Sequence, residues 1–288
     1  MDKKPDLITL SLGAGVQSTC LYLMACQGEI LPRPDVAIFS DTGWEPPEVY
    51  EHLEKLKANG SIPINIVSGG NIRDDVINYV TSWRENGSGS GWLRGQPPMY
   101  ARIPDEVSKM NNKEPDKGGP LWRKCTEKYK IKPIQNEIRR LLGYKKGQHV
   151  RKLAYQYFGI SSDEMQRMKD SRTTWIDNRY PLVDMRMNRT KCIDWLEKNN
   201  WHNVEKSACI GCPYHDNKMW EHMKNNRPEQ WADAVEFDKA MRDGPYPHTK
   251  GQVYLHPNMI PLDQVELSTA EDRGQLSFLD ECEGMCGV

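Results

Sequence analysis

The chain has 288 residues, of which 38% are hydrophobic and 27% are charged, and its formal net charge is −1. This composition is typical of a globular protein, and it provides no overall positive field that would draw the molecule to nucleic acid or to an anionic membrane. The longest apolar runs have the length of strands. We therefore expect no membrane span and no signal peptide, and the cytoplasm is the expected location.

The first third of the chain alternates short apolar runs with longer helical patterns. Strands are predicted at Leu7–Leu12, Val36–Ser40 and Ile62–Val67, and helices at Gln17–Gln27, Glu48–Asn59 and Ile72–Trp83. Strands that alternate with helices of this length form βαβ units around a parallel sheet. The predicted fold class is therefore α/β, with ligands bound at the carboxyl ends of the strands.

Residues 86–120 break this alternation with sequence rich in glycine and proline. A loop of this length is either a functional lid or a disordered insertion, and both interpretations stay open.

The remaining elements are mostly helical. A strand is predicted at Leu153–Ser161, and helices at Lys128–Leu142, Thr190–Asn199 and Asn217–Arg242. We divide the chain into a nucleotide-binding α/β domain at residues 1–200 and a cysteine-bearing helical region with a flexible C-terminal tail at 201–288.

The turn after the first strand is suited to an anion. Small residues let the backbone approach a phosphate, and the following helix presents free N–H groups. The turn lacks the lysine of a Walker A loop and the third glycine of a dinucleotide fingerprint, so a tight turn without a ligand is the alternative. The residues predicted to bind a nucleotide here are Ser11, Gly13, Ala14, Gly15, Gln17, Ser18 and Thr19.

The second strand ends in an acid and a hydroxyl, Asp41 and Thr42, followed by Gly43. Parallel strands bring these carboxyl ends together, so we expect these residues beside the first turn, where they suit contacts to a ribose or an adenine edge.

The eight cysteines divide into two kinds. Cys20 and Cys26 lie in an apolar helix and are expected to be packing residues. Cys209 and Cys212 form a Cys-x2-Cys pair with a glycine between them and a proline after them, and a tight turn of this kind aims both thiolates at one centre. Thiolates suit zinc and iron–sulfur clusters alike.

Five short motifs, in order over about residues 7–215, resemble those of the PP-loop (adenine nucleotide α-hydrolase-like) superfamily and of its PAPS reductase-like branch. They are Gly13–Thr19, Ser40–Tyr50, Arg123–Ile134, Gly159–Arg167 and Tyr180–Asp184.

The resemblance implies a Rossmann-like PP-loop domain that binds an adenine nucleotide, namely ATP, adenylyl sulfate or PAPS. It also implies that Gly159, Asp163 and Glu164 contact the nucleotide. Lys130 and Arg167 are the basic residues expected to act on phosphate or sulfate, and the further basic candidates are Arg123, Lys124, Lys128 and Arg172.

The resemblance to adenylyl sulfate reductases favours a 4Fe–4S cluster over zinc. Cys125 and Cys192 are then the candidates that join Cys209 and Cys212 as ligands. Cys192 lies in a predicted helix, where burial is an equal alternative, and His215 is a further candidate ligand.

The chain ends in Glu281-Cys282-Glu283-Gly284-Met285-Cys286-Gly287-Val288. In the reductases that it resembles, such a tail carries the nucleophilic cysteine. This implies Cys282 as the nucleophile and Cys286 as a resolving thiol, with a thioredoxin-like protein as reductant. Adventitious metal binding, or no role, is the alternative.

Two departures from the family pattern bear on the reaction. The first serine of the loop is Gly13, and the aspartate that lies near Mg²⁺ in ATP-cleaving members is Gln17. Asp41 could still hold Mg²⁺. Thr126 replaces the second cysteine of the Cys-Cys pair.

Three functions follow as hypotheses. The first is a PAPS or adenylyl sulfate reductase-like oxidoreductase. The second is an ATP-dependent iron–sulfur sulfurtransferase that thiolates nucleic acid, as in tRNA thiolation or DNA phosphorothioation. The third is a non-catalytic nucleotide-sensing partner. A homo-oligomer is compatible with all three.

Overall fold

A five-stranded parallel sheet in the order β3-β2-β1-β6-β7 forms the centre of one half of the molecule. The computed structural model describes residues 4–86, 95–102, 119–242, 244 and 251–268. The strands are β1 (Leu7–Ser11), β2 (Val36–Asp41), β3 (Ile64–Ser68), β6 (Ala154–Phe158) and β7 (Ile176–Arg179). The predicted α/β class and parallel sheet are confirmed. Strand β7 was not predicted, because its four residues include the polar run Asp-Asn-Arg.

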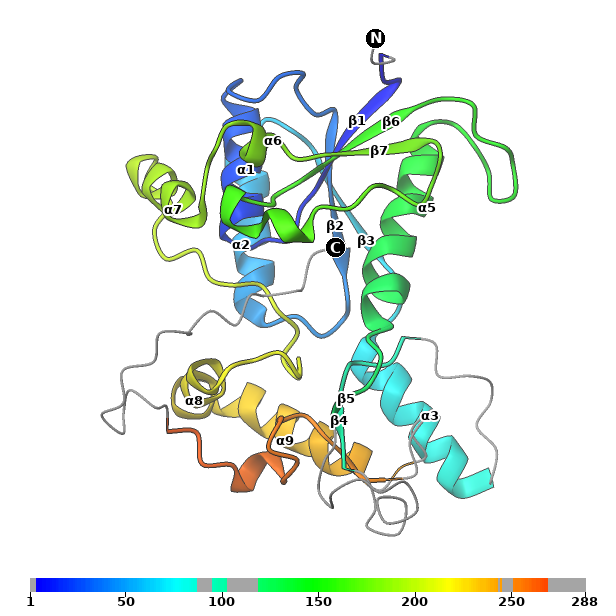
Figure 1. Cartoon of the computed structure of the whole chain (residues 1–288), viewed down its shortest axis with the longest axis vertical. Coiled ribbons are helices and arrows are strands. Elements are labelled where there is room, and N and C mark those ends of the chain that lie inside the picture. Colours follow the sequence, from blue (N-terminus) through cyan, green and yellow to red (C-terminus); the bar gives the residue numbers. More distant parts are fainter. Residues whose placement is uncertain (1–3, 87–94, 103–118, 243, 245–250, 269–288) are drawn as a thin grey trace.

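Helices cover both faces of the sheet (Figure 1). One face packs against α1 (Val16–Cys26), α2 (Pro47–Asn59), α6 (Pro181–Asp184) and α7 (Arg189–Lys198), and the other packs against α5 (Lys132–Leu141). Strand β2 shows why both faces are covered. Ala37 and Phe39 belong to the first core, whereas Val36 and Ile38 belong to the core under α5, as the two-residue period of a strand requires.

A second group of elements lies beyond the carboxyl ends of the strands (Figure 1). It contains α3 (Ile72–Asn86), α8 (Asn217–Asn226) and α9 (Pro228–Arg242), with a small antiparallel sheet of β5 (Gly119–Pro120), β4 (Tyr100–Ala101) and β8 (Val253–Tyr254). A short 3₁₀ turn, Leu262–Gln264, follows β8. These elements share a separate core built around Trp44, Trp220 and Phe237.

One predicted helix and one predicted loop differ from the structure. The stretch at Asn217–Arg242 is two helices, because Pro228 cannot donate a backbone hydrogen bond and Arg227 leaves the helical region before it. The segment 86–120 is not one loop, since α3 extends to Asn86 and β4 and β5 lie in its described part. The division at residue 200 stays a prediction. No helix among the described residues is long and apolar enough to cross a membrane.

The helix predicted at Lys128–Leu142 begins with a π-helical turn, Thr126–Ile131, that runs into α5. The cause is Pro133, which has no N–H to donate to the carbonyl of Tyr129 four residues earlier. That carbonyl instead accepts a hydrogen bond of 2.6 Å from the Ser40 hydroxyl, at the end of β2. Lys132 N–H bonds to the carbonyl of Glu127, five residues back, which is the π pattern. The hydrogen bond from Ser40 joins the carboxyl end of β2 to the π-helical turn that leads into α5.

Candidate functional site

The turn between β1 and α1 has the geometry of an anion-binding loop. Gly15 is the N-cap of α1, and the Ser18 hydroxyl both accepts from the Gly15 N–H (3.2 Å) and donates to the Gly15 carbonyl (3.1 Å). Ala14 adopts a left-handed conformation with φ of 58°. The first turn of α1 contains no acid, so its N–H groups keep their partial positive charge for an anion.

Gly159 closes one side of this loop. It follows β6, and a Cβ at this position would lie 2.7 Å from both the N and the Cα of Ser18. Only glycine allows the strand end and the helix start to approach so closely. Gly159, which was predicted to contact the nucleotide, therefore lies directly against the anion loop.

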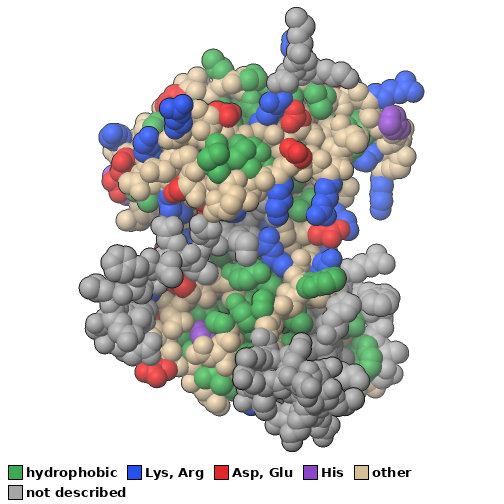
Figure 2. All heavy atoms as spheres, viewed as in Figure 1, with side chains coloured by type: hydrophobic (Ala, Val, Ile, Leu, Met, Phe, Trp, Pro, Cys, Tyr) green, Lys and Arg blue, Asp and Glu red, His purple; other side chains and the backbone are tan. Residues whose placement is uncertain are grey.

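A cleft with a volume of about 570 Å³ opens in front of the loop. Figure 2 shows Lys and Arg side chains gathered across the middle of this face of the molecule. Nine basic and three acidic side chains line the cleft, so it carries six net positive charges in a chain whose net charge is −1. The basic residues are Arg123, Lys124, Lys130, Lys132, Arg167, Lys169, Arg172, Arg189 and Lys206, and the acidic ones are Glu127, Glu164 and Asp170.

Most of the predicted nucleotide-binding residues line this cleft. They are Ser11, Gly13, Gly15, Gln17, Ser18, Gly159 and Glu164, together with Lys130 and Arg167. Glu164 forms an ion pair of 2.7 Å with Arg167 and fixes its guanidinium at the cleft wall. Sequence reasoning missed Arg189, whose guanidinium donates to Gln17 Oε1 (3.2 Å), and Lys206. Nothing in their local sequence distinguishes them from surface cations.

The other predicted nucleotide-binding residues do not line this cleft, and Thr42 among them lines the smaller pocket described below. Thr19 is fully buried, and its hydroxyl bonds to Nε2 of His52 on α2 at 2.9 Å. Ala14 is buried in the first core. Gly43 and Asp163 do not line the cleft, and Asp163 caps the start of α7 by accepting from the Arg189 N–H. The further basic candidate Lys128 bonds to Asp75 instead of facing the anion loop.

Asp41 is also occupied by structural contacts. Its Oδ1 accepts from the Gly43 N–H (2.7 Å) and from the Tyr50 hydroxyl (2.8 Å), and it does not line the cleft. Burial, with the hydrogen bond to Asp41, raises the pKa of Tyr50, so the phenol stays a donor. Asp41 thus organises the turn that follows β2, and its role at a metal ion stays a prediction.

A second, smaller pocket adjoins the cleft and brings three predicted cysteines together. Cys125, Cys209 and Cys212 line it, and its other walls are largely apolar, with Trp44, Pro97 and Pro213 among them. Cys125 directly precedes the π-helical turn. Cys212 N–H donates to the Cys209 carbonyl at 3.1 Å, which closes the predicted turn.

The Cys-x2-Cys turn is held from both sides. A Cβ on Gly211 would lie 2.0 Å from the Trp44 ring, so the indole fills the space that any side chain at Gly211 would need. His215 is buried, and its Nε2 donates to the carbonyls of Cys209 (2.9 Å) and Ile210 (3.1 Å). Burial lowers the pKa of His215 to about 4, so the ring is neutral at pH 7. The side chain therefore supports the turn, and its Nε2 is not available as a metal ligand.

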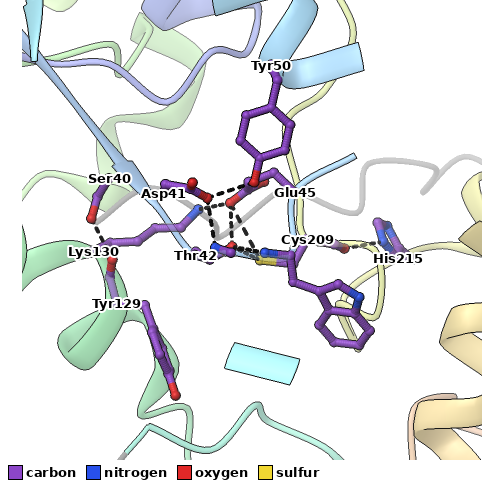
Figure 3. Close-up of polar contacts among 11 residues, drawn as sticks. Ser40, Asp41, Thr42, Glu45, Tyr50, Tyr129, Lys130, Cys209 and His215 are labelled. Atoms are coloured by element: carbon purple, nitrogen blue, oxygen red, sulfur yellow. Dashed lines mark hydrogen bonds and ion pairs between the residues drawn. The ribbon is translucent and has the colours of Figure 1, made fainter. Parts of the chain in front are cut away.

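Figure 3 shows the polar contacts at the end of β2, beside this turn. The Thr42 hydroxyl donates to Glu45 Oε1 at 2.9 Å and lies 3.2 Å from Cys209 Sγ. Cys209 Sγ is 3.7 Å from the same Glu45 oxygen, and Lys130 Nζ is 3.8 Å from it. The Glu45 side chain is 1% exposed. In this arrangement the Cys209 sulfur lies within hydrogen-bonding distance of both the Thr42 hydroxyl and the buried Glu45 carboxylate.

Cys192 does not reach this pocket, contrary to the prediction. It is fully buried in the core between α1 and α7, where its thiol is hydrogen-bonded with Cys20. This contact and burial raise the pKa of Cys20, as expected for inert packing thiols. The helical period of α7 turns Cys192 towards the sheet. Cys20 is confirmed as a packing residue.

The cysteine pocket fits a metal centre in the type of its donors. Within the described residues, however, no group of three or more His, Cys, Asp or Glu side chains is arranged to hold a metal ion. The three thiols share a pocket without converging on one point. Cys282 and Cys286 lie outside the described residues.

The basic cleft and the cysteine pocket share part of their lining. Arg123, Thr126 and Lys130 line both the cleft and the cysteine pocket. Thr126 and Lys130 belong to the π-helical turn that Ser40 anchors. An anion in the cleft and the cysteine thiols would therefore be separated by single side chains.

No family model matches the sequence, and no curated protein matches it. Among solved structures, the PAPS reductase of Candida auris in its phosphate complex is similar over 67% of this chain and 72% of that chain, with 13% identity and a TM-score of 0.37. The U34-tRNA thiolase NcsA of Methanococcus maripaludis, with its 4Fe–4S cluster, is similar over 82% of this chain and 72% of that chain, with 12% identity and a TM-score of 0.38. Values this low do not carry the reaction of either protein over to this chain.

Proposed function

We propose that this chain is an enzyme that binds an adenine nucleotide in the basic cleft and performs sulfur chemistry where the cleft meets the cysteine pocket. The observation that carries the proposal is the shared wall, in which Arg123, Thr126 and Lys130 line both compartments. The loop before α1 supports phosphate binding, and thiols beside a bound nucleotide support chemistry on sulfur.

The reaction that we propose first is the reduction of adenylyl sulfate or PAPS. A sulfonucleotide needs no metal ion to bind, whereas ATP cleavage of the PP-loop type uses an acid near Mg²⁺. The position of that acid is Gln17, and its side-chain oxygen accepts from Arg189. Six net positive charges lining the cleft favour an anion that arrives without its own cation.

In this reaction the thiolate of Cys282 attacks the sulfur of the sulfate group. An S–S bond forms, the S–O bond to the nucleotide phosphate breaks, and the nucleotide leaves with the bonding electrons as AMP or adenosine bisphosphate. A dithiol reductant then attacks the Cys282 sulfur, and sulfite leaves with the electron pair. The second thiol of the reductant releases Cys282 and forms a disulfide, so two electrons pass from dithiol to sulfate. Lys130 and Arg167 would neutralise the charge of the leaving phosphate.

Cys125, Cys209 and Cys212 would hold a 4Fe–4S cluster, or zinc as the alternative. When bound, the centre would supply a Lewis-acidic metal ion, iron or zinc, with thiolate ligation beside the nucleotide. Cys209 would bind as the thiolate, close to the Glu45 carboxylate. Lys130, 3.8 Å from Glu45, would offset the negative charge that this creates.

The test is sulfite release from adenylyl sulfate and from PAPS, with anaerobically purified protein and a dithiol reductant. We expect release by the natural chain and its loss in Cys282→Ser. Cys26→Ser, a half-buried cysteine remote from the pocket, is the matched control and should keep full activity. Nucleotide binding without sulfite release from either substrate would rule the reductase reaction out.

A second function, ATP-dependent thiolation of nucleic acid, is supported by one observation. With Cys192 in the core, three cysteines line the pocket, and a 4Fe–4S cluster held there would keep one iron free of cysteine. An open iron suits delivery of a sulfur atom. AMP formation from ATP that requires a nucleic-acid acceptor would support this function over the reductase. Binding of nucleotide without either turnover would support the sensing role.

A further inference from the structure

A second concentration of positive charge lies away from the cleft. Residues 139–152 contain six Lys and Arg residues and no acid. They are Arg139, Arg140, Lys145, Lys146, Arg151 and Lys152. The run covers the last turn of α5 and the loop that leads to β6, and Lys145, Lys146 and Arg151 are all exposed. In a chain with a net charge of −1, such a run is a local concentration of positive charge.

This loop is ordered by its own contacts. The Arg139 guanidinium donates to the Gln148 carbonyl at 2.7 Å, and Gln148 Oε1 accepts from the Lys145 N–H at 2.6 Å. Tyr144 N–H bonds to the Arg139 carbonyl at 3.0 Å, where α5 ends. The charges are therefore presented on a defined loop and not on a random tail.

The basic surface continues from this loop to the mouth of the cleft. Arg139 stacks on the Trp175 ring at 5.0 Å, and Gln135, one turn earlier on α5, bonds to Thr173 at 3.1 Å. Lys132 at the start of α5 lies beside Glu127, whose pKa is lowered first by the hydrogen bond from Lys132 and also by Lys124 and Arg172. One side of α5 therefore joins both groups of cations.

We propose that this side of α5 is a nucleic-acid-binding track that runs from loop 143–152 to the cleft mouth. The ten residues of α5 span about 15 Å. Lys132 lies at its start and Arg139 in its last turn, with the polar Gln135 between them, so cations at both ends of this span suit separated phosphates of one polynucleotide strand. Arg140 is paired with Glu137 and does not count toward these cations. The Arg139–Trp175 pair suits a nucleobase. A mononucleotide in the cleft would leave the loop cations without a ligand, so the track goes beyond the proposed reductase reaction and would serve the second function, thiolation of nucleic acid.

The chemistry of the track favours nucleic acid over a membrane surface. Interfacial membrane binding needs apolar side chains that enter the lipid as well as basic ones. No large hydrophobic side chain among residues 132–152 is exposed. The apolar residues of α5, such as Ile134 and Ile138, face the sheet.

The test is binding of a fluorescently labelled single-stranded oligonucleotide of about twenty nucleotides, measured by anisotropy at several salt concentrations. The variant Lys145→Glu/Lys146→Glu reverses two track charges. We expect its affinity to fall about tenfold or more, and the slope of log affinity against log salt to fall by about two. Lys191→Glu/Lys198→Glu on α7 changes the net charge equally and should bind like the natural chain.

Three results would overturn the proposal. These are no oligonucleotide binding at low salt, an equal loss in the α7 control, and binding to vesicles containing phosphatidylserine but not to the oligonucleotide. Far-ultraviolet circular dichroism and the melting temperature check that both variants are folded. Sulfite release in Lys145→Glu/Lys146→Glu separates this proposal from the proposed reaction, since the track variant should retain it.

Discussion

The hydroxyl of Thr42 lies 3.2 Å from the sulfur of Cys209, although the two residues are 167 positions apart in the chain. This contact joins the carboxyl end of β2 to the Cys-x2-Cys turn. Strand β2 borders the nucleotide cleft, and the Cys-x2-Cys turn carries the thiols. Because the two are in direct contact, a substitution that displaces one of them should also displace the other.

Gly211→Ala should damage the cysteine turn. The added methyl would lie 2.0 Å from the Trp44 ring, and the indole is itself packed on Phe237 at 4.6 Å. We expect a loss of about 1–3 kcal/mol in the free energy of unfolding, measured in urea, with loss of any metal bound at the pocket. Gly119→Ala is the control, because a Cβ there meets nothing within 4 Å. Equal effects of the two substitutions would argue against the Trp44 contact.

Cys209→Ser and Cys192→Ser should have opposite effects. Cys209→Ser should remove bound iron and sulfur chemistry with little change in stability, because Cys209 is partly exposed. Cys192→Ser places a hydroxyl in the core beside Cys20, which should lower the free energy of unfolding by about 1–3 kcal/mol. The iron content per folded molecule should stay unchanged. Iron and sulfide analysis with urea unfolding checks both. Loss of iron in Cys192→Ser would instead identify Cys192 as a ligand of the metal centre.

Ser40 and Pro133 should be energetically coupled. Ser40→Ala leaves the Tyr129 carbonyl without the hydroxyl that it accepts from, which should cost about 1–3 kcal/mol. Pro133→Ala supplies an N–H that can bond to that carbonyl and convert the π turn to an α turn. The double variant should therefore be more stable than the sum of the single effects predicts, as measured by a double-mutant cycle. Simple additivity would exclude this account of the π turn.

Stability should fall as the pH drops from 7 to 5. His256 Nδ1 accepts from the Asn258 N–H and Nε2 donates to Asn217, so the folded state needs the neutral ring. Burial lowers its pKa from 6.5 to about 4, so the unfolded chain takes up a proton first as the pH falls below 6.5. His256 alone should lower the free energy of unfolding by about 2 kcal/mol between pH 7 and pH 5.

Urea midpoints at pH 7 and pH 5 measure the effect. In His256→Gln the difference between the two pH values should shrink by this amount, since the amide does not titrate. His52 has a similarly lowered pKa of about 4 and should account for part of the remainder. An unchanged pH dependence in the variant would contradict the assignment.

The sequence pattern predicted four of the five strands of the sheet, because β1, β2, β3 and β6 are apolar runs and the helices between them show a helical period, whereas β7 is mostly polar. It also predicted the gathering of Cys125 with Cys209 and Cys212, through motif order. The sequence could not decide whether Cys192 is a metal ligand or a core residue, because a helical period does not say which face of the helix meets the sheet. The contacts of Thr19 with His52 and of Gly211 with Trp44 join distant segments, and local sequence carries no trace of either. The π turn was not predicted, because it depends on the Ser40 hydroxyl of a distant strand as well as on Pro133.

Strand β1 lies in the middle of the sheet, and its Leu7 is paired with Ala154. During synthesis, β1 therefore leaves the ribosome long before β6, and one of its edges stays unpaired until β6 has followed. Such an edge invites pairing with another chain, so newly made protein would depend on chaperones over this interval. Cys209 emerges after all five strands of this sheet, so a centre held by Cys125, Cys209 and Cys212 could be loaded only after those strands have been made.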